Sequence, residues 1–219
     1  MEVNLIAWTP EPEKVVAAAA RLCYSPDAVP ELMAGLEREQ VRRLVGQLYD
    51  RGHLSTFEHV SFQFSVDGVS RALSHQLVRH RIASYSQRSQ RYVRETGFRS
   101  VVPPSVRENP AALTRFQAAL DELQSAYAAL LEEVPAEDAR YVLPNACMTS
   151  LLVTMNARAL LHFFELRTCT RAQWEIRELA RRMLTLVREV APHLFRRAGP
   201  PCETGKPCPE GEMSCKRKK

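Results

Sequence analysis

The sequence predicts an α+β fold, a mostly helical single domain built around a small central sheet. Three observations lead to this prediction. Apolar residues recur at helical spacing over several long segments, they alternate with polar residues over a few short ones, and no internal repeat is visible. Of the 219 residues, 45% are apolar and 25% are charged, which is typical of a globular protein and excludes wholesale disorder.

Capping residues and alternation place the elements of the first half of the chain. Thr9 and Pro10 have the residue types of a helix N-cap and first turn, so we expect them to open a helix through the alanine-rich segment. Between Val60 and Val66 apolar residues alternate with serine and glutamine, as in a half-buried strand. The other expected elements are a strand over Val3–Trp8, an end of the first helix near Tyr24, turns at Ser25–Pro30 and Arg51–His53, a helix over Glu37–Tyr49, a strand end at Asp67 and Gly68, a helix from Val69 to about Arg81, and an extended segment at Tyr92–Arg94.

Prolines divide the second half. Val101–Pro110 is rich in proline, and Asn109 followed by Pro110 should cap a long amphipathic helix. Pro135 should open a short helix that ends before Pro144. The remaining expected elements are a strand around Leu151–Met155 and helices over about Ala157–Leu166 and Arg171–Phe195.

Composition also sets the expected domain boundary. Residues 1–197 should form the single domain, whereas residues 198–219 have almost nothing to bury and are expected to be a disordered tail. This tail carries Cys202, Cys208 and Cys215, with no histidine among them. Because zinc normally takes four ligands, we expect no metal site in the chain.

Cysteine usage and hydropathy indicate where the protein works. Cys23, Cys147 and Cys169 are scattered through the body of the chain, which is typical of a reducing cytoplasm rather than of a disulfide framework. No basic leader precedes an apolar run at the start, so we expect no secretory signal. The apolar stretches are far shorter than the roughly 18 residues of a membrane helix. The expected location is the cytoplasm, without a membrane partner.

Charge is concentrated in one window. Residues 71–99 contain seven arginines and a single acidic residue, Glu95, so the window has a formal charge of +6, whereas the whole chain has +5. Such a focused arginine field favours an anionic, phosphorylated ligand. No two glycines before the tail are close enough for a G-x-G or Walker loop, which disfavours Rossmann and P-loop enzymes. Arginines, hydroxyls and helix N-termini must therefore hold the phosphate.

Residues 76–92 combine the groups that a nucleotide needs. Arg79 and Arg81 cannot share a helix face, so they should reach two anions or two parts of one ligand, while nearby serines and glutamines can bind a base edge. Composition alone leaves open a solvated basic loop. A nucleic-acid-binding module would need interleaved aromatic residues, and only Tyr85 and Tyr92 qualify, so we expect no nucleic-acid partner.

The same block resembles the signature of the flavin-dependent thymidylate synthases. Arg79, His80 and Arg81, followed after seven residues by Ser89, match R-H-R-x7-S. Five further blocks resemble family segments in the same order: residues 51–59 (RGHLSTFEH), 139–144 (ARYVLP), 156–158 (NAR), 166–167 (LR) and 172–176 (AQWEI). The resemblance covers roughly Ile6 to Phe195, and no arginine of the signature is missing, so nothing favours a regulator that has lost catalysis.

The resemblance implies an enzyme with the fold of that family. It implies a cytoplasmic homotetramer with active sites at the subunit interfaces. The ligands that it implies are FAD, dUMP, 5,10-methylenetetrahydrofolate and NADPH. It also implies a methyltransferase reaction of de novo nucleotide biosynthesis. NADPH reduces FAD, the folate supplies a one-carbon unit to uracil C5, and the products are dTMP and tetrahydrofolate.

The resemblance also assigns site residues position by position. The expected FAD-binding residues are Ser55, Arg79, His80, Arg81, Gln87, Asn156, Ala157, Arg158 and His162. The expected dUMP-binding residues are Gln76, Leu77, Val78, Arg79, Gln87, Arg88, Ser89, Gln90, Arg91, Arg140 and Arg167. The family commonly has glutamate at position 87 and asparagine at position 162, so Gln87 and His162 depart from its pattern.

Arg167 is the residue to which the resemblance assigns activation of the pyrimidine. Uracil C5 is a poor nucleophile until the N3 proton is lost, and arginine can stabilise the resulting anion because it keeps its own proton. A charge-assisted hydrogen bond of about 1.5–3 kcal/mol corresponds to roughly one or two pKa units, so desolvation and flavin stacking must contribute as well. This route needs no thiolate. We expect Cys147 and Cys169 to be inert, and Ser89, which has no identifiable base beside it, to bind dUMP rather than attack it.

Overall fold

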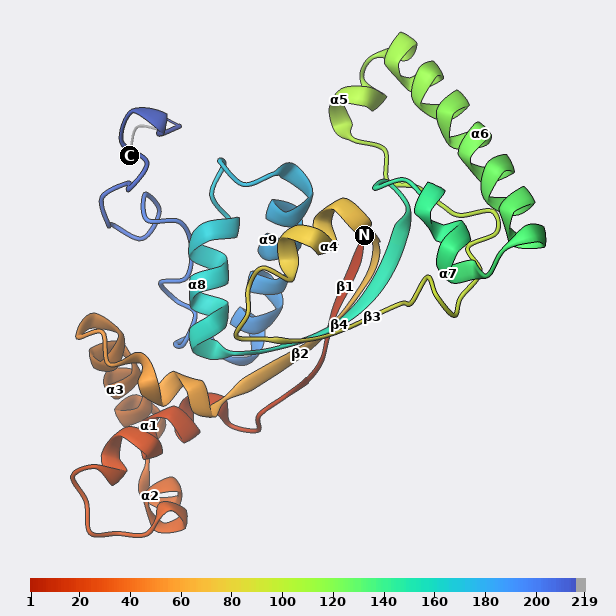
Figure 1. Ribbon diagram of the computed structural model, residues 1–219. Helices are drawn as coiled ribbons and strands as arrows, with labels where there is room; N and C mark the ends of the chain where they lie inside the picture. Colours follow the sequence, from red (N-terminus) through yellow and green to blue (C-terminus); the bar gives the residue numbers. More distant parts are fainter. Residues whose placement is uncertain (216–219) are drawn as a thin grey trace. The chain divides into compact units, whose positions relative to one another are not determined.

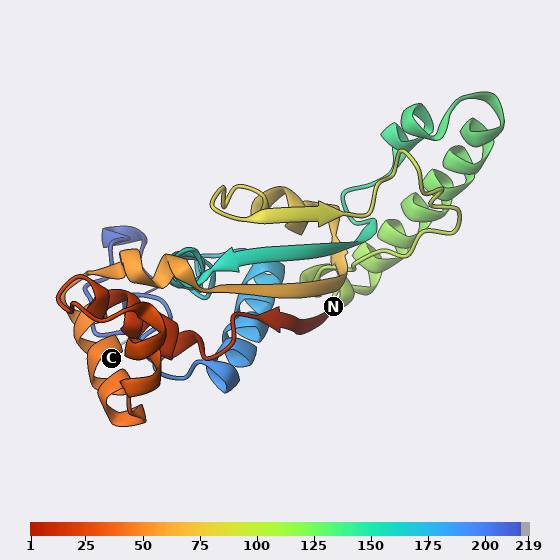
Figure 2. The same cartoon turned by 90° about the horizontal axis from the view of Figure 1, so that it is seen from below.

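The computed structural model describes residues 1–215 (Figure 1) and has the α+β fold that the sequence predicts. Its sheet is antiparallel, with four strands in the order β1-β2-β4-β3, as Figure 2 shows. The strands are β1 (Glu2–Trp8), β2 (Ser61–Ser70), β3 (Ser84–Gln87) and β4 (Met148–Asn156). The helices are α1 (Pro12–Leu22), α2 (Val29–Gly35), α3 (Arg38–Asp50), α4 (Arg71–Leu77), α5 (Pro104–Arg107), α6 (Pro110–Glu133), α7 (Ala136–Ala139), α8 (Ala157–Arg167) and α9 (Trp174–Val190), with 3₁₀ turns η1 (Leu54–His59), η2 (Arg140–Val142) and η3 (Gly211–Met213).

The chain divides into two compact units, and the boundaries between them fall within all four strands and between Arg79 and His80. Unit 1 comprises Met1–Glu2, Val66–Arg79 and Ser86–Leu151. Unit 2 comprises Val3–Ser65, His80–Tyr85 and the residues from Leu152 onward.

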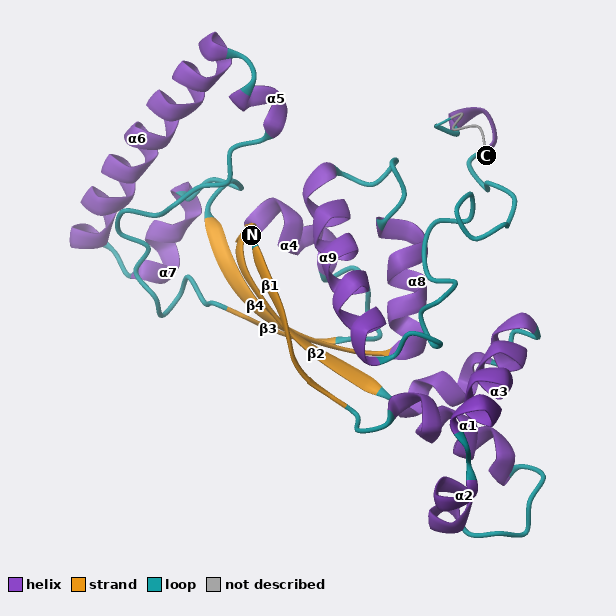
Figure 3. Cartoon of the chain, turned by 180° about the vertical axis from the view of Figure 1, so that it is seen from behind, coloured by secondary structure: helices purple, strands orange, loops and turns teal. Residues whose placement is uncertain are grey.

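In unit 2, aromatic rings form the core between strand and helix. Phe62 on β2 contacts Phe195, just after α9, with ring centroids 5.3 Å apart, and Phe195 also contacts Phe164 of α8. α8 packs against α9, whose buried residues Ile176, Leu179, Met183 and Val187 recur at helical spacing. A separate group is formed by α1, which packs against α2, α3 and η1 (Figure 3).

In unit 1, the long helix α6 supports the loops. Asn109 caps it as predicted, because its side chain accepts a hydrogen bond from the backbone nitrogen of Ala112. Tyr127 and Leu131 of α6 are buried with Ala139 of α7, and a second cluster joins residues 98, 120 and 147. The hydroxyl of Tyr127 accepts a hydrogen bond from the Glu95 backbone nitrogen, which fixes the loop that follows the arginine-rich block.

Several predicted boundaries were wrong. Thr9 does not cap α1, because it continues the pairing of β1 with β2: its backbone nitrogen donates to Ser61 O and its hydroxyl accepts from the Ser61 nitrogen. β2 does not end at Gly68 but runs on to Ser70, and Gly68 adopts φ +67° within it, a conformation that suits glycine. Ser70 then caps α4, which stops at Leu77, well before the predicted end.

Other elements were missed or predicted with the wrong extent. No helix was predicted at α2, and β3 was predicted to be a loop. The predicted extended segment at Tyr92–Arg94 was wrong, because Tyr92 lies in a turn and Val93 in a bend. α9 occupies only residues 174–190 of the predicted 171–195. It begins after Gln173, whose side chain caps it, and ends where Pro192 cannot donate a helical hydrogen bond.

The predicted tail lies partly outside the described residues, because Lys216–Lys219 are not described. From Ala198 to Cys215 the chain forms turns and η3. Within the described part of the chain, no helix combines the length and the hydropathy needed to span a bilayer.

Candidate functional site

The predicted site residues divide between the two units. Every expected dUMP-binding residue except Arg167 belongs to unit 1. Most of the expected FAD-binding residues belong to unit 2, and only Arg79 and Gln87 belong to unit 1. The boundary between units falls inside the R-H-R signature, between Arg79 and His80.

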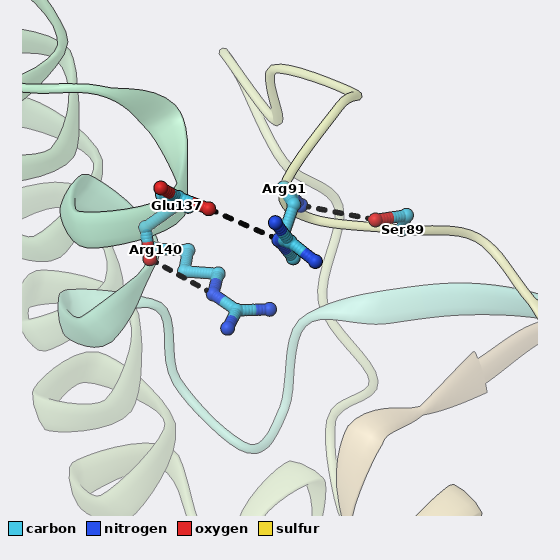
Figure 4. A network of polar contacts seen from close by, with 4 residues as sticks. All are labelled: Ser89, Arg91, Glu137 and Arg140. Carbon is cyan, nitrogen blue, oxygen red and sulfur yellow. Dashed lines mark hydrogen bonds and ion pairs between the residues drawn. The ribbon is translucent and has the colours of Figure 1, made fainter.

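In unit 1, Glu137 organises the two arginines Arg91 and Arg140. The Glu137 carboxylate accepts a hydrogen bond from Arg91 Nε at 3.0 Å, and its backbone oxygen accepts one from Arg140 Nε, also at 3.0 Å (Figure 4). Ser89 joins this group, because its hydroxyl oxygen accepts a hydrogen bond from the Arg91 backbone nitrogen. Four residues from two segments that lie far apart in the sequence therefore meet in one group, whose two arginines are of the kind that binds an anion.

Glu137 was missed by the sequence analysis. Its position one helical turn before Arg140 is a signal for a local contact, but its contact with Arg91 is 46 residues distant and follows only from the fold. The ion pair with Arg91 is about half exposed on both sides, so it contributes only about 0.2–1 kcal/mol. An incoming phosphate can displace this carboxylate at small cost.

Replacing Glu137 with glutamine is expected to tighten dUMP binding about 2- to 5-fold, because the competing charge is removed while the backbone contact to Arg140 is kept. Calorimetric titration with dUMP measures the change. Glu133→Gln, at the end of α6, is the matched loss of one acidic charge and should leave the affinity as it is. A more than tenfold weakening in Glu137→Gln would show that the carboxylate itself holds the ligand.

The glutamines of unit 1 have structural partners. The Gln87 side-chain nitrogen donates to Ser74 Oγ at 3.1 Å and to Thr149 Oγ1 at 3.3 Å, so it links β3 to α4 and β4. Its amide oxygen is the group that it can offer to a ligand. Gln90 is buried and donates to Cys147 Sγ at 3.7 Å. The side chains of Gln90 and Leu77 are therefore both buried in the protein interior. These two residues can contact a ligand only through their backbone groups.

Cys147 has the environment of an inert thiol. Its side chain is fully buried, and this burial raises its pKa to about 11, so the thiolate is scarce at neutral pH. This agrees with a reaction that does not use a cysteine nucleophile.

In unit 2, His80 holds Arg167. Arg167, the last residue of α8, donates from Nε to His80 Nε2 at 3.0 Å. The His80 ring contacts the edge of Phe163, with centroids 4.9 Å apart, and lies 6.2 Å from the His162 ring. Burial, followed by the charges of Arg167 and His162, lowers the pKa of His80 to about 4. The imidazole is therefore neutral at physiological pH, as an acceptor from arginine must be.

Burial also affects Arg167 and the neighbouring Tyr85. It lowers the pKa of Arg167 from its ordinary value, yet an arginine remains protonated at neutral pH. The Tyr85 hydroxyl donates to the His80 backbone oxygen at 2.9 Å, and burial raises its pKa to about 12, so it stays a donor. His80 is thus fixed from its backbone and from its ring.

The pKa of His80 predicts how stability depends on pH. Because its pKa is about 4 in the folded protein and about 6.5 in the unfolded chain, the unfolded state binds more protons between these values. Its contribution to stability is fully present above pH 6.5 and is lost as pH falls from 6.5 towards 4. Urea unfolding at several pH values, at fixed protein concentration, is expected to show a flatter pH dependence in this range for His80→Gln. His59→Gln, at an exposed histidine, is the control, and equal slopes for both variants would contradict the assignment.

Asn156, Ala157 and Arg158, three of the predicted flavin residues, lie at the N-terminus of α8, whereas His162 lies in its middle. Asn156 caps the helix through Oδ1, which accepts from the Ala159 nitrogen at 2.8 Å, and the Ala157 nitrogen donates to Val60 O. Arg158 forms an ion pair with Glu58 of η1, which keeps its guanidinium beside this end of α8. Ser55 in η1 and His162 are exposed, as is Arg81. A helix N-terminus with an adjacent arginine is suited to a phosphate.

Comparisons with known proteins show the family of the whole chain. The family model for the thymidylate synthase complementing protein matches residues 4–193. A relative from Geobacter sulfurreducens, named flavin-dependent thymidylate synthase, is 55% identical over 98% of this chain and 94% of its own length. Proteins of the same name from Clostridium tetani and Sulfurisphaera tokodaii are 50% and 42% identical, over 98% and 92% of this chain and 93% and 79% of theirs.

Proposed function

The chain belongs to the thymidylate synthase complementing protein family, the flavin-dependent thymidylate synthases, and we propose that unit 1 supplies the nucleotide contacts of this activity and unit 2 the flavin contacts. The reaction is the reductive methylation of dUMP to dTMP, with 5,10-methylenetetrahydrofolate as one-carbon donor and NADPH as reductant. The observation that carries the assignment is the match to relatives over nearly the whole chain, together with the retention of every arginine of the signature.

The residues of unit 2 fit FAD by their chemistry. FAD presents a pyrophosphate and an aromatic ring system, and the chain offers the α8 N-terminus with Arg158, the neutral imidazole of His80, and the exposed His162. When bound, FAD supplies the hydride that completes the methyl group. The residues proposed to hold it in unit 2 are Ser55, His80, Arg81, Asn156, Ala157, Arg158 and His162, and Arg79 and Gln87 add contacts from unit 1.

The nucleotide is proposed to bind to the arginine group of unit 1. Arg91 and Arg140 are proposed to bind the phosphate, because the Glu137 carboxylate already occupies an anion position beside Arg91. The other proposed contacts, several through the backbone, are Gln76, Leu77, Val78, Arg79, Gln87, Arg88, Ser89 and Gln90.

Arg167 is proposed to stabilise the pyrimidine anion. Loss of the N3 proton to solvent raises the electron density at C5, and the guanidinium of Arg167 offsets the charge that remains on the ring. His80 is a positioning residue for Arg167, since its ring nitrogen fixes the guanidinium at one end and leaves the other nitrogens for the substrate. Because the hydrogen bond between Arg167 and His80 is already present without substrate, the guanidinium does not have to be reoriented when dUMP binds.

A homotetramer in the cytoplasm is proposed as well. Apolar side chains remain exposed on the sheet within unit 2: Ile6 and Trp8 on β1, and Leu152 on β4, have 52%, 43% and 41% of their surface exposed. Such residues favour contact with another subunit. Light scattering on the eluting protein should then give four times the chain mass of 24.9 kDa.

Release of tritium from [5-³H]dUMP tests the proposed activity. The full chain, loaded with FAD and assayed without oxygen, should release tritium and form dTMP only when the folate and NADPH are both present. The protein freed of FAD should release none until the flavin is restored. A loaded protein that binds dUMP yet forms no dTMP with all substrates present would overturn the proposal.

A further inference from the structure

Four of the six cysteines line a single cavity in unit 2. Cys169 belongs to the loop after α8, whereas Cys202, Cys208 and Cys215 belong to the C-terminal segment. The cavity has a volume of about 70 Å³. The sequence alone offered only the three cysteines of the tail, and the fold adds the fourth.

Several contacts hold the C-terminal segment against the rest of unit 2. Glu210 forms an ion pair with Arg171, two residues after Cys169, at a distance of 3.4 Å. Arg188 of α9 donates from Nη2 to the Ala198 backbone oxygen at 2.8 Å, and the ammonium of Lys206 lies 5.8 Å from the Tyr49 ring centroid. The segment that carries three of the cysteines is therefore held to the rest of unit 2 by several contacts.

We propose that Cys169, Cys202, Cys208 and Cys215 bind one Zn²⁺ ion. Four thiolates are a complete tetrahedral ligand set for structural zinc, and soft sulfur ligands select this kind of metal. Grouped cysteines in a protein of a reducing compartment bind metals more often than they form disulfides. The structure describes all six cysteines as thiols. On binding, each of the four thiols loses its proton to solvent and its sulfur becomes a zinc ligand.

Metal binding requires the loops to close around the ion. Within residues 1–215, no three ligating side chains already stand close enough to form a ready-made metal site. Cys202 lies in a turn, and Cys208 and Cys215 have no regular secondary structure, so no helical or strand hydrogen bonds hold their backbones in place. Coupling of this kind between metal binding and local folding is usual for structural zinc. Arg171 lines the cavity together with Glu165 and Glu210, and it forms an ion pair with Glu210.

The proposed zinc site also bears on Arg167. Cys169 follows Arg167 by two residues, so the ion would anchor the loop directly after the C-terminal end of α8. His80 fixes Arg167 from one side, and the zinc site would fix the chain that leaves it. Any effect of this anchoring on the rate of dTMP formation rests on the proposed function, whereas the zinc site itself does not.

Metal content of the full chain tests the proposal. Protein purified under reducing conditions with zinc, and then desalted, is expected to contain about one zinc per chain by elemental analysis, with Zn–S distances of about 2.3 Å by X-ray absorption. The Cys208→Ser and Cys215→Ser variants each lack one of the four ligands, so they are expected to retain almost no zinc after desalting. Cys23→Ser removes an exposed cysteine outside the cavity and should keep it.

Cobalt and proteolysis give two further measurements. Co²⁺ added to the reduced, zinc-free chain should produce intense visible bands of a tetrahedral thiolate site in wild type and Cys23→Ser, but not in Cys215→Ser. Zinc should slow cleavage by a glutamate-specific protease after Glu210 at least tenfold in the same two proteins. Metal-free wild type without cobalt bands, or equal metal content in Cys23→Ser and Cys215→Ser, would overturn the zinc site. Neither result depends on dTMP formation, so failure of the site and failure of the enzyme activity are distinguishable.

Discussion

Replacing Arg167 with lysine is expected to lower the rate of dTMP formation about 100- to 1000-fold, the loss typical of removing one group that stabilises charge in a transition state. Lysine keeps the positive charge but cannot both bond His80 and face a pyrimidine with a planar fork. FAD content and the affinity for dUMP should change much less than turnover, because most of the proposed contacts to both molecules are made by other residues. Single-turnover assays and dUMP titration of the same preparation measure the two effects.

A substitution that keeps the positive charge at another helical arginine provides the control for Arg167→Lys. Arg182→Lys on α9 alters an exposed ion pair with Glu178 and should leave turnover unchanged. Tritium release by Arg167→Lys at the wild-type rate would remove Arg167 from the role assigned to it. A parallel loss of FAD would instead indicate that the residue supports the flavin site.

Replacing Arg140 with alanine is expected to weaken dUMP binding about 10- to 100-fold, because a charge-assisted contact of about 1.5–3 kcal/mol is lost. Arg140 already points its Nε at the Glu137 backbone, so its remaining nitrogens are directed without a further change of conformation. Calorimetry with dUMP and with deoxyuridine separates the two parts of the ligand. The variant should lose affinity for dUMP while its weak affinity for deoxyuridine stays equal to that of wild type.

Arg115→Ala, on the exposed surface of α6 in the same unit, is matched for the loss of one positive charge. It should bind dUMP almost as tightly as wild type does, since distant surface charges are screened by salt. If Arg140→Ala lost the same factor towards dUMP and deoxyuridine, the contact would be with the base or the sugar, and the phosphate assignment would fail.

Elements with a buried face could be predicted from the sequence. Phe62 and Phe64 of β2 alternate with half-exposed residues, and the same holds for Val153 and Met155 of β4, because one face of each strand packs on a core. β3 lacks this signal, since Ser84–Gln87 is a polar strand at the sheet edge whose position follows from pairing with β4. The true role of Thr9 was also hidden, because a threonine before a proline looks like a helix cap until its partner strand is known.

The arginines of the site were visible in the sequence because the signature fixes their residue types and spacing. Their partners were not, because these depend on contacts across the fold. Glu137 reaches Arg91 and His80 reaches Arg167 over 46 and 87 positions of sequence, respectively. The cavity that Cys169 shares with the tail cysteines likewise follows from contacts across the fold. Residue chemistry indicated what the site needs, whereas the packing of α7 and α8 determines which neighbour supplies it.

The hydrogen bond between His80 and Arg167 joins a cation to an uncharged acceptor. Aspartate in place of this imidazole would grip the guanidinium at least as firmly, but it would cancel the electrostatic potential that the guanidinium projects beyond the pair. The neutral imidazole of His80 holds the Arg167 guanidinium in place without cancelling its positive charge. The full attraction of Arg167 for an electron-rich partner is thereby preserved for whatever approaches its other face.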